Sequence, residues 1–125
     1  MIKPHGGDIL KPLFVENLEE RNTLIEESVS LPDLVLNSAA AANAVMLGAG
    51  YFSPLEGYMN LRDTLSVSEK MRTESGLFWP VPCVNRTDDI SQIEGVSVIA
   101  LRDPNVTGNP VLAIQNIESI ETLSD

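Results

Sequence analysis

Two short apolar runs in the carboxy-terminal third of the chain constrain its fold more than any other feature. Residues 96–101 and 111–117 each have the length and the β-branched content of a strand. Between them, residues 102–110 are rich in the turn formers Asp, Asn, Gly and Pro. The two runs therefore predict an antiparallel hairpin with a wide loop.

Three other segments predict further strands. Residues 13–15 and 34–36 are short and apolar, and the second is expected to be buried because a turn former bounds it on each side. Residues 77–84 are longer, but Pro80 and Pro82 lack the N–H that a β-ladder needs. That strand is expected at a sheet edge or with a bend, and the whole pattern predicts a β-rich α+β fold.

Helices are predicted in the amino-terminal half. Residues 17–29 show a loose helical pattern in an acidic background, as a surface helix does. Ser38 is expected to cap a helix through residue 47, with Gly48 ending it in a left-handed conformation. Asn60 is expected to cap a helix that reaches Met71. A single helical turn is expected at residues 90–94.

Two details of packing are also predicted. The last helix should present Leu61, Leu65, Ser68 and Met71 along one side. Residues 50–59, although irregular, carry large apolar side chains and should be packed down. Within that loop, Gly57→Val is expected to destabilise the fold if Gly57 needs a positive φ or close packing.

The length of 125 residues fits one compact domain, residues 1–125, and is too short for a second catalytic lobe. Hydrophobic residues make up 43% and charged residues 21%, as in an ordinary globular protein. Polar residues and Pro interrupt the low-charge stretch 38–55, so it is not a membrane span, and the first 13 residues lack the apolar middle of a signal peptide. We expect a cytoplasmic protein.

The net charge of −10 argues against nucleic-acid binding. A protein that grips phosphate backbones needs clustered cations, whereas the eight Lys and Arg residues here are scattered along the chain.

Single residues offer little chemistry. Cys83 lies in an apolar run with no cation nearby in sequence, so we expect a buried, unreactive thiol in place of a catalytic one. His5 has no second His beside it for a phosphate or metal site, and we expect it to fix the amino-terminal corner by a hydrogen bond. Arg72 and Arg86 flank Phe78-Trp79 and would suit an anion or an adjoining domain, although ordinary surface arginines are commoner.

The acidic pairs Glu26-Glu27 and Asp88-Asp89 are interpreted as solvated surface charges, because adjacent side chains diverge on a helix or strand. Asp63 and residues 103–105 lack the alternating oxygen spacing of a calcium loop. We therefore assign no catalytic, cofactor-binding or metal-binding residue in this chain.

Four segments, in chain order, resemble the amino-terminal domain of the ATP sulfurylase (sulfate adenylyltransferase) family. The family opening Ile-x-Pro-His-Gly-Gly-x-Leu stands as residues 2–10, with one extra residue before the leucine. The family's Phe-Ser-Pro-Leu-x-Gly-Phe-Met stands as residues 52–59, and its Met-Arg…Gly-x-x-Trp-Pro-x-Pro as residues 71–82. Residues 100–118 resemble its closing hairpin. The matches span nearly the whole chain in family order, which makes them specific together.

This resemblance implies a PUA-like pseudo-barrel of mixed strands with short helices. It also implies a longer enzyme that converts MgATP and sulfate to adenosine 5′-phosphosulfate and pyrophosphate. The family's catalytic signatures, Gln-x-Arg-Asn-Pro and His-x-x-His, belong to the following domain and do not occur in this sequence. The resemblance thus implies a domain inactive by itself, with the carboxy-terminal catalytic domain of the same chain as its partner and a homo-oligomer at full length.

Gly50-Tyr51 ahead of Phe52 and the long loop at 104–109 depart from the family pattern. We interpret them as variation of the sulfur-oxidising or sulfate-reducing bacterial kind. The alternative hypothesis is a stand-alone PUA-like module that binds RNA or another protein.

Overall fold

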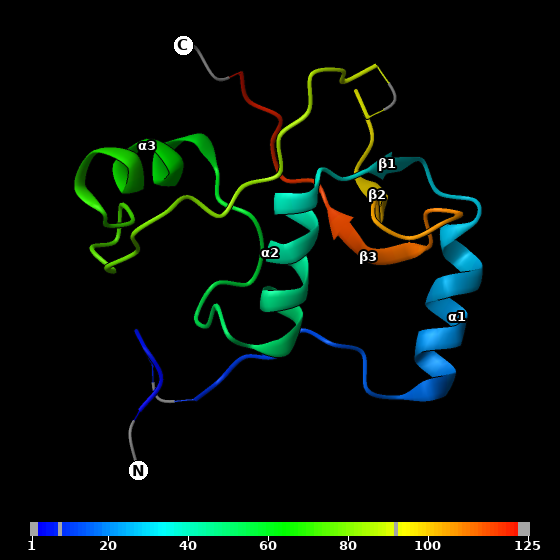
Figure 1. The fold of residues 1–125 in the computed structure, drawn as a ribbon, viewed down its shortest axis with the longest axis horizontal. Coiled ribbons are helices and arrows are strands. Elements are labelled where there is room, and N and C mark those ends of the chain that lie inside the picture. The colour runs from blue at the N-terminus through cyan, green and yellow to red at the C-terminus, as the bar shows by residue number, and fades with distance from the viewer. Residues whose placement is uncertain (1–2, 8, 92, 123–125) are drawn as a thin grey trace.

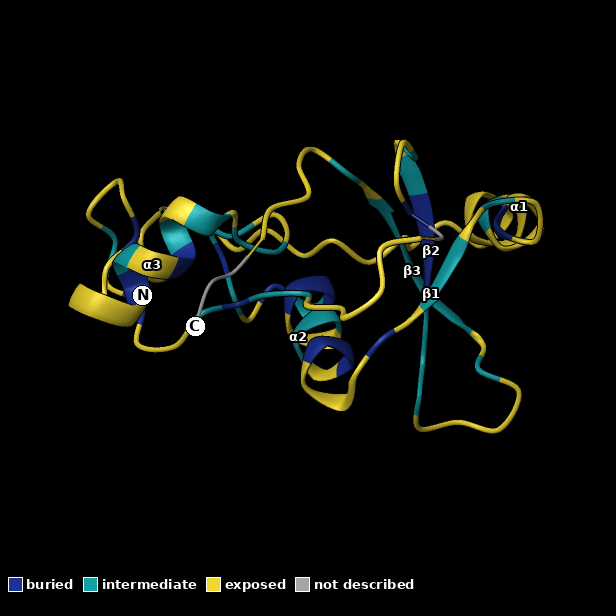
Figure 2. Ribbon diagram, turned by 90° about the horizontal axis from the view of Figure 1, so that it is seen from above, coloured by how far each residue is buried: buried dark blue, intermediate teal, exposed yellow. Residues whose placement is uncertain are grey.

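The computed structural model describes residues 3–7, 9–91 and 93–122 of the chain. Its elements are α1 (Leu18–Ser28), β1 (Asp33–Val35), α2 (Ser38–Ala49), α3 (Leu61–Lys70), β2 (Val98–Arg102) and β3 (Val111–Asn116). Figure 1 shows α1 and α2 on opposite sides of a small sheet, with α3 standing apart from it. Seen from above, α3 and the sheet lie toward opposite ends of the molecule, with α2 between them (Figure 2).

The sheet has the order β1-β2-β3, with β1 parallel and β3 antiparallel to β2. The predicted hairpin is confirmed: β2 and β3 pair from Val98↔Asn116 onward, and the register shifts near Leu101 and Arg102 before the loop. β2 is central, so its middle residues are covered on both sides and are buried. The mixed sheet with short helices confirms the α+β fold, in which the helices hold more of the described residues than the strands do.

The main core lies between α2 and the sheet. Its buried members are apolar residues from the turn before β2, from β2 itself and from the start of α2: Leu36, Ala40, Ala41, Ile93, Ile99 and Leu101. The small alanines let α2 approach the sheet closely, which accounts for the alanine run in this helix. The predicted strand 34–36 occurs one residue earlier, and only Leu36 beyond its end is buried, since Val35 remains 50% exposed.

The ends of α2 differ from the prediction by one or two residues. Asn37, not Ser38, is the N-cap, and its side-chain oxygen accepts from the Ala40 N–H at 2.8 Å. The left-handed residue that ends the helix is Gly50, with φ of 83°, and not Gly48. Gly48 lies inside the helix, where the Phe14 ring occupies the space that a Cβ would need.

The bounds of α3 match the prediction. Asn60 is its N-cap, with its side chain accepting from the Asp63 N–H at 2.9 Å. The predicted buried side is wrong: Thr64 and Val67 are buried, while Leu65 is 50% exposed. The reason is that α3 does not cover the sheet and instead packs against the turn that follows it, where the Trp79 N–H donates to Met71 O.

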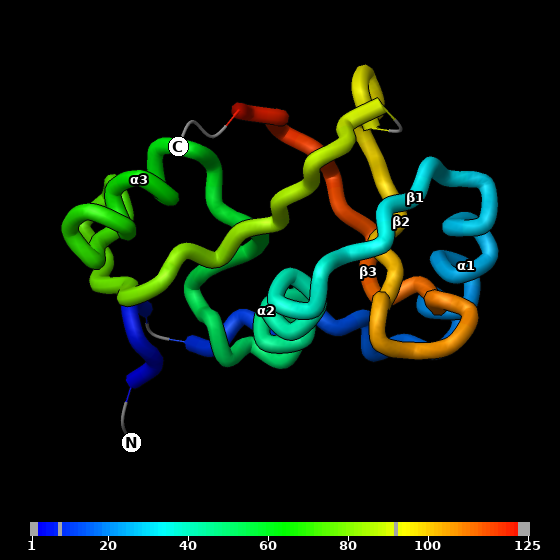
Figure 3. Tube along the Cα trace, turned by 45° about the horizontal axis from the view of Figure 1, so that its top comes forward, coloured from blue at the N-terminus to red at the C-terminus, as the bar shows by residue number. Residues whose placement is uncertain are grey.

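Two predicted strands, 13–15 and 77–84, are wrong. Residues 13 and 14 both donate to Gly48 O at the end of α2, which leaves no ladder for a strand. Residues 77–84 make only an isolated bridge, Phe78 with Arg72, because Pro80 and Pro82 remove two donors from the same side. Figure 3 shows this segment crossing from α3 toward the sheet as a single extended stretch.

Residues 50–59 are mostly packed down, as predicted, with Ser53 buried and Phe52 edge-on to Trp79 at a centroid separation of 5.4 Å. Tyr51 is the exception, with 74% of its surface exposed. Neither condition is met at Gly57, which has no left-handed φ and no atom within 4 Å of the position of a Cβ. Gly50 holds that conformational role in the loop.

Candidate functional site

A cleft of about 520 Å³ lies between the amino-terminal corner, the loop after α2 and the extended segment after α3. Its walls are mainly aromatic rings and prolines, with few polar groups: His5, Asn43, Tyr51, Phe52, Ser53 and residues 78–83. This cleft could not be predicted from the sequence. Its parts come from three separate segments, and only the run of aromatic and proline residues at 78–82 hinted at it.

His5 is a structural residue of this cleft. Its Nε2–H donates to Phe78 O at 2.7 Å, 73 residues away in sequence, and its ring lies beside those of Phe78 and Trp79. The predicted corner-fixing hydrogen bond is therefore confirmed. The bond occupies Nε2 and orients the ring, as a positioning contact does.

Cys83 lines the cleft and is only 1% exposed. Burial raises the pKa of its thiol to about 11, so the thiol is protonated at neutral pH. Burial likewise raises the pKa of Tyr58, helped by the nearby Cys83, and the Tyr58 hydroxyl donates to Ala40 O at 2.7 Å. The predicted burial of Cys83 is confirmed, and a protonated thiol is a poor nucleophile because the thiolate is the reactive form.

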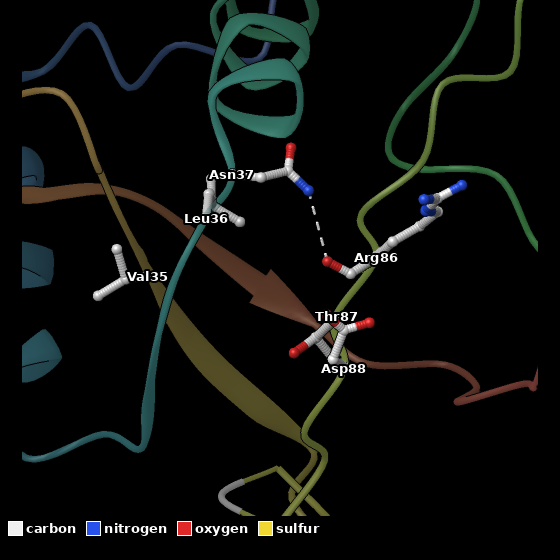
Figure 4. Close-up of a pocket in the computed structure, with 6 residues that line it drawn as sticks. All are labelled: Val35, Leu36, Asn37, Arg86, Thr87 and Asp88. Carbon is white, nitrogen blue, oxygen red and sulfur yellow. Dashed lines mark hydrogen bonds between the residues drawn. The ribbon is translucent and has the colours of Figure 1, made fainter.

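A second cleft, of about 330 Å³, lies where the chain leaves β1. It is lined by Val35, Leu36, Asn37 and residues 86–88, and the Asn37 amide donates to Arg86 O at 3.5 Å. Figure 4 shows the Arg86 guanidinium pointing away from Thr87 and Asp88. Arg86 therefore does not converge with other polar side chains on a ligand position.

Other cations are occupied by internal contacts. Arg72 donates to Gly76 O at 3.1 Å and lies 6.0 Å from the Phe78 ring centroid. Arg102 donates to Asp33 at 2.7 Å and to Asn109 O at 3.1 Å, which ties β1 to the hairpin loop. Lys11 pairs with Glu56 at 3.3 Å. These contacts direct the three side chains toward groups of the domain itself.

The carboxylates are dispersed as predicted. Asp63 accepts from the Glu74 N–H and Asp103 from the Asn105 N–H, so the two act in separate turns. Hydrogen bonds from Ser91 lower the pKa of the exposed Asp89. Among the described residues there is no group of three His, Cys, Asp or Glu side chains that would hold a metal ion.

The sequence matches the family model described as "PUA-like domain" over residues 2–124. The chain belongs to the PUA-like domain family. Matched relatives of this PUA-like domain include sulfate adenylyltransferases from Alcanivorax borkumensis (52% identical over 125 residues), Allochromatium vinosum (51% over 125) and the Riftia pachyptila sulfur-oxidizing endosymbiont (48% over 126). Each match covers 100% of this chain.

The domain is much shorter than those relatives. It spans 31%, 32% and 28% of their respective lengths, and it corresponds to their amino-terminal region. A solved structure titled "Hexameric APS kinase from Thiobacillus denitrificans" is similar to 94% of this domain, with a TM-score of 0.73 and 30% identity, over 23% of that chain. No helix among the described residues is long and apolar enough to cross a bilayer.

Proposed function

We propose that this PUA-like domain is the non-catalytic amino-terminal part of a sulfate adenylyltransferase, and that it supports the catalytic part of the same polypeptide. The full-length enzyme converts ATP and sulfate to adenosine 5′-phosphosulfate and pyrophosphate. The observation that carries the proposal is that the Alcanivorax borkumensis enzyme is 52% identical over all 125 residues, although they make up only 31% of its length.

The geometry of the described residues favours a structural role for this domain over a catalytic one. Transfer of an adenylyl group requires donors that converge on phosphate oxygens and on the developing charge. Here Arg72, Arg102 and Lys11 are held in internal contacts, and Arg86 points away from its cleft. MgATP and sulfate would therefore be held by the carboxy-terminal domain.

Titration calorimetry tests this proposal on the isolated chain. MgATP and sulfate, added separately and together, are expected to give no heat beyond dilution. The full-length Alcanivorax borkumensis enzyme serves as the positive control under the same conditions. Saturable binding of MgATP to the 125-residue chain at micromolar concentration would contradict the proposal.

The alternative of an RNA-binding module receives no support from the charges. Lys11, Arg72 and Arg102 are engaged within the molecule, and the net charge of the chain is −10. Filter binding with RNA at low salt separates the two functions, because RNA association that falls steeply with added salt would favour the module.

We also propose that the full-length enzyme is a cytoplasmic homo-oligomer. The oligomer is supported by the solved structure in which a similar domain belongs to a protein titled hexameric. Sedimentation of the full-length protein, at concentrations from about 0.1 to about 10 µM, tests the oligomer. A mass that is a multiple of the chain mass is expected, and the mass of a single chain at every concentration would contradict the oligomer.

A further inference from the structure

The hydrogen-bond pattern of β2 and β3 fixes which backbone groups of β3 point out of the sheet. Ile117 N–H donates to Ser97 O at 2.8 Å, so this pair and the pair Ile99↔Gln115 are the hydrogen-bonded positions. The neighbouring residues, Ile114 and Asn116, therefore direct their N–H and C=O groups away from β2.

The opposite side of β2 confirms this alternation. Ala100 N–H donates to Pro32 O and Arg102 O accepts from the Leu36 N–H, so the even-numbered residues of β2 face β1. Ala100 pairs with Ile114 in the ladder, and the backbone N–H and C=O groups of Ala100 point toward β1. The N–H and C=O groups of Ile114 must therefore point away from β2, toward the free side of β3. No hydrogen bond within the described part of the chain reaches the outward N–H or C=O groups of Ile114 or Asn116.

β3 also lacks the devices with which proteins protect a sheet edge. Its sequence, residues 111–116, contains no charge and no Pro, and it is longer than β1 at the other edge. Most of its residues are only partly buried, whereas the middle of β2 is fully buried. In Figure 1 it forms the lower edge of the sheet, with α2 and α1 to either side. Such an edge is a template for another strand.

We propose that an extended segment of the polypeptide following residue 125 in the full-length enzyme adds to β3 as an antiparallel fourth strand. This inference rests on the proposed function. About two-thirds of the relatives' length lies outside this chain, and consecutive strands are neighbours in most sheets. The added strand has alternating apolar residues, since it continues a sheet whose edge residues Leu112 and Ala113 already pack against the core.

A second copy of the chain is a less suitable occupant of the edge. Pairing two β3 strands would bring together two chains that each carry a net charge of −10. An intramolecular strand has no such cost, because it arrives tethered to the same sheet.

The experiment compares this chain with a chimera in which residues 1–125 are followed by the remaining part of the Alcanivorax borkumensis relative. Hydrogen–deuterium exchange is measured on peptides that cover β3. In the chain alone Ile114 and Asn116 amides exchange quickly and Gln115 slowly. In the chimera the exchange of the two outward amides slows by roughly 100-fold or more, so β3 takes up two fewer deuterons at early times.

Proline substitutions supply a matched pair. Asn116→Pro removes an outward N–H from an exposed residue, and is expected to lower the melting temperature of the chimera while leaving the chain alone unchanged. Gln115→Pro removes an inward N–H that bonds to Ile99, and is expected to lower both.

Activity of the chimera separates the two proposals. An active chimera whose β3 exchanges as in the chain alone overturns the added strand and leaves the proposed function standing. An inactive chimera with slowed exchange overturns the proposed function and leaves the added strand standing. An inactive chimera with unchanged exchange overturns both the proposed function and the added strand. Protection of Ile114 and Asn116 in the chain alone that grows with protein concentration assigns the edge to a second copy, which also overturns the added strand.

Discussion

Gly50→Ala is expected to destabilise the domain strongly, because two effects coincide at this position. Gly50 ends α2 with φ of 83°, a left-handed conformation that costs a residue with a Cβ about 1–2 kcal/mol. A Cβ there would lie 3.1 Å from Pro12 N and 3.2 Å from Pro12 Cα, so the backbone of the amino-terminal segment must shift. Overpacking of this kind adds on the order of 1 kcal/mol.

Gly108→Ala is the matched control. Gly108 has nearly the same φ, 85°, but no atom lies within 4 Å of its Cβ position. Differential scanning calorimetry should show a loss of about 4–8 °C for Gly108→Ala, roughly twice that for Gly50→Ala, and almost none for Gly57→Ala. Equal shifts for Gly50→Ala and Gly108→Ala would refute the contact with Pro12, and an unchanged Gly50→Ala would refute the capping argument as well.

Three further predictions concern single contacts. Asn60→Ala should lower the unfolding free energy by about 1 kcal/mol in urea titrations, because the Asp63 N–H loses its cap. Arg102→Met should cost about 1–2 kcal/mol, since it removes the partly exposed pair with Asp33 and one loop contact; a melting temperature equal to that of the native chain would count against this. The pKa of Cys83 is raised to about 11 in the folded state. The protonated thiol therefore contributes fully to the unfolding free energy below about pH 8.5, the pKa of a free thiol. This contribution is lost as the pH rises toward 11. Cys83→Ala should accordingly flatten the fall in melting temperature between those pH values, and an identical fall in both proteins would show that another group is responsible.

The elements that depend on local signals were predictable from the sequence. Asn60 and Asn17 cap their helices with side-chain bonds that reach only three residues ahead, and the hairpin of β2 and β3 is set by a turn-rich loop between two apolar runs. At the start of α2 the predicted N-cap, Ser38, lies only one residue from the observed N-cap, Asn37.

The larger errors concern segments whose neighbours in space are not shown by local composition. Residues 13–15 have strand composition, but the Leu13 and Phe14 N–H groups donate to Gly48 O near the end of α2. The buried side of α3 could not be read from its apolar spacing, because the turn after the helix covers Thr64 and Val67. A segment becomes a strand only if it pairs with another segment. The sequence identifies that partner only when a turn-rich loop joins the two.

At the candidate site, too, features set by neighbouring residues were predictable and features set by distant segments were not. The burial of Cys83 followed from sequence, since it depends on the types of residue nearby. The contact of His5 with Phe78 O and the open edge of β3 did not, because both arise only when distant segments are brought together by the fold.

Pyrophosphate release from ATP in the presence of sulfate tests the central claim most directly. The 125-residue chain alone should release none above the rate without protein, and the chimera with the rest of the Alcanivorax borkumensis enzyme should turn over. Sulfate-dependent release by the chain alone would contradict the assignment of a supporting, non-catalytic domain.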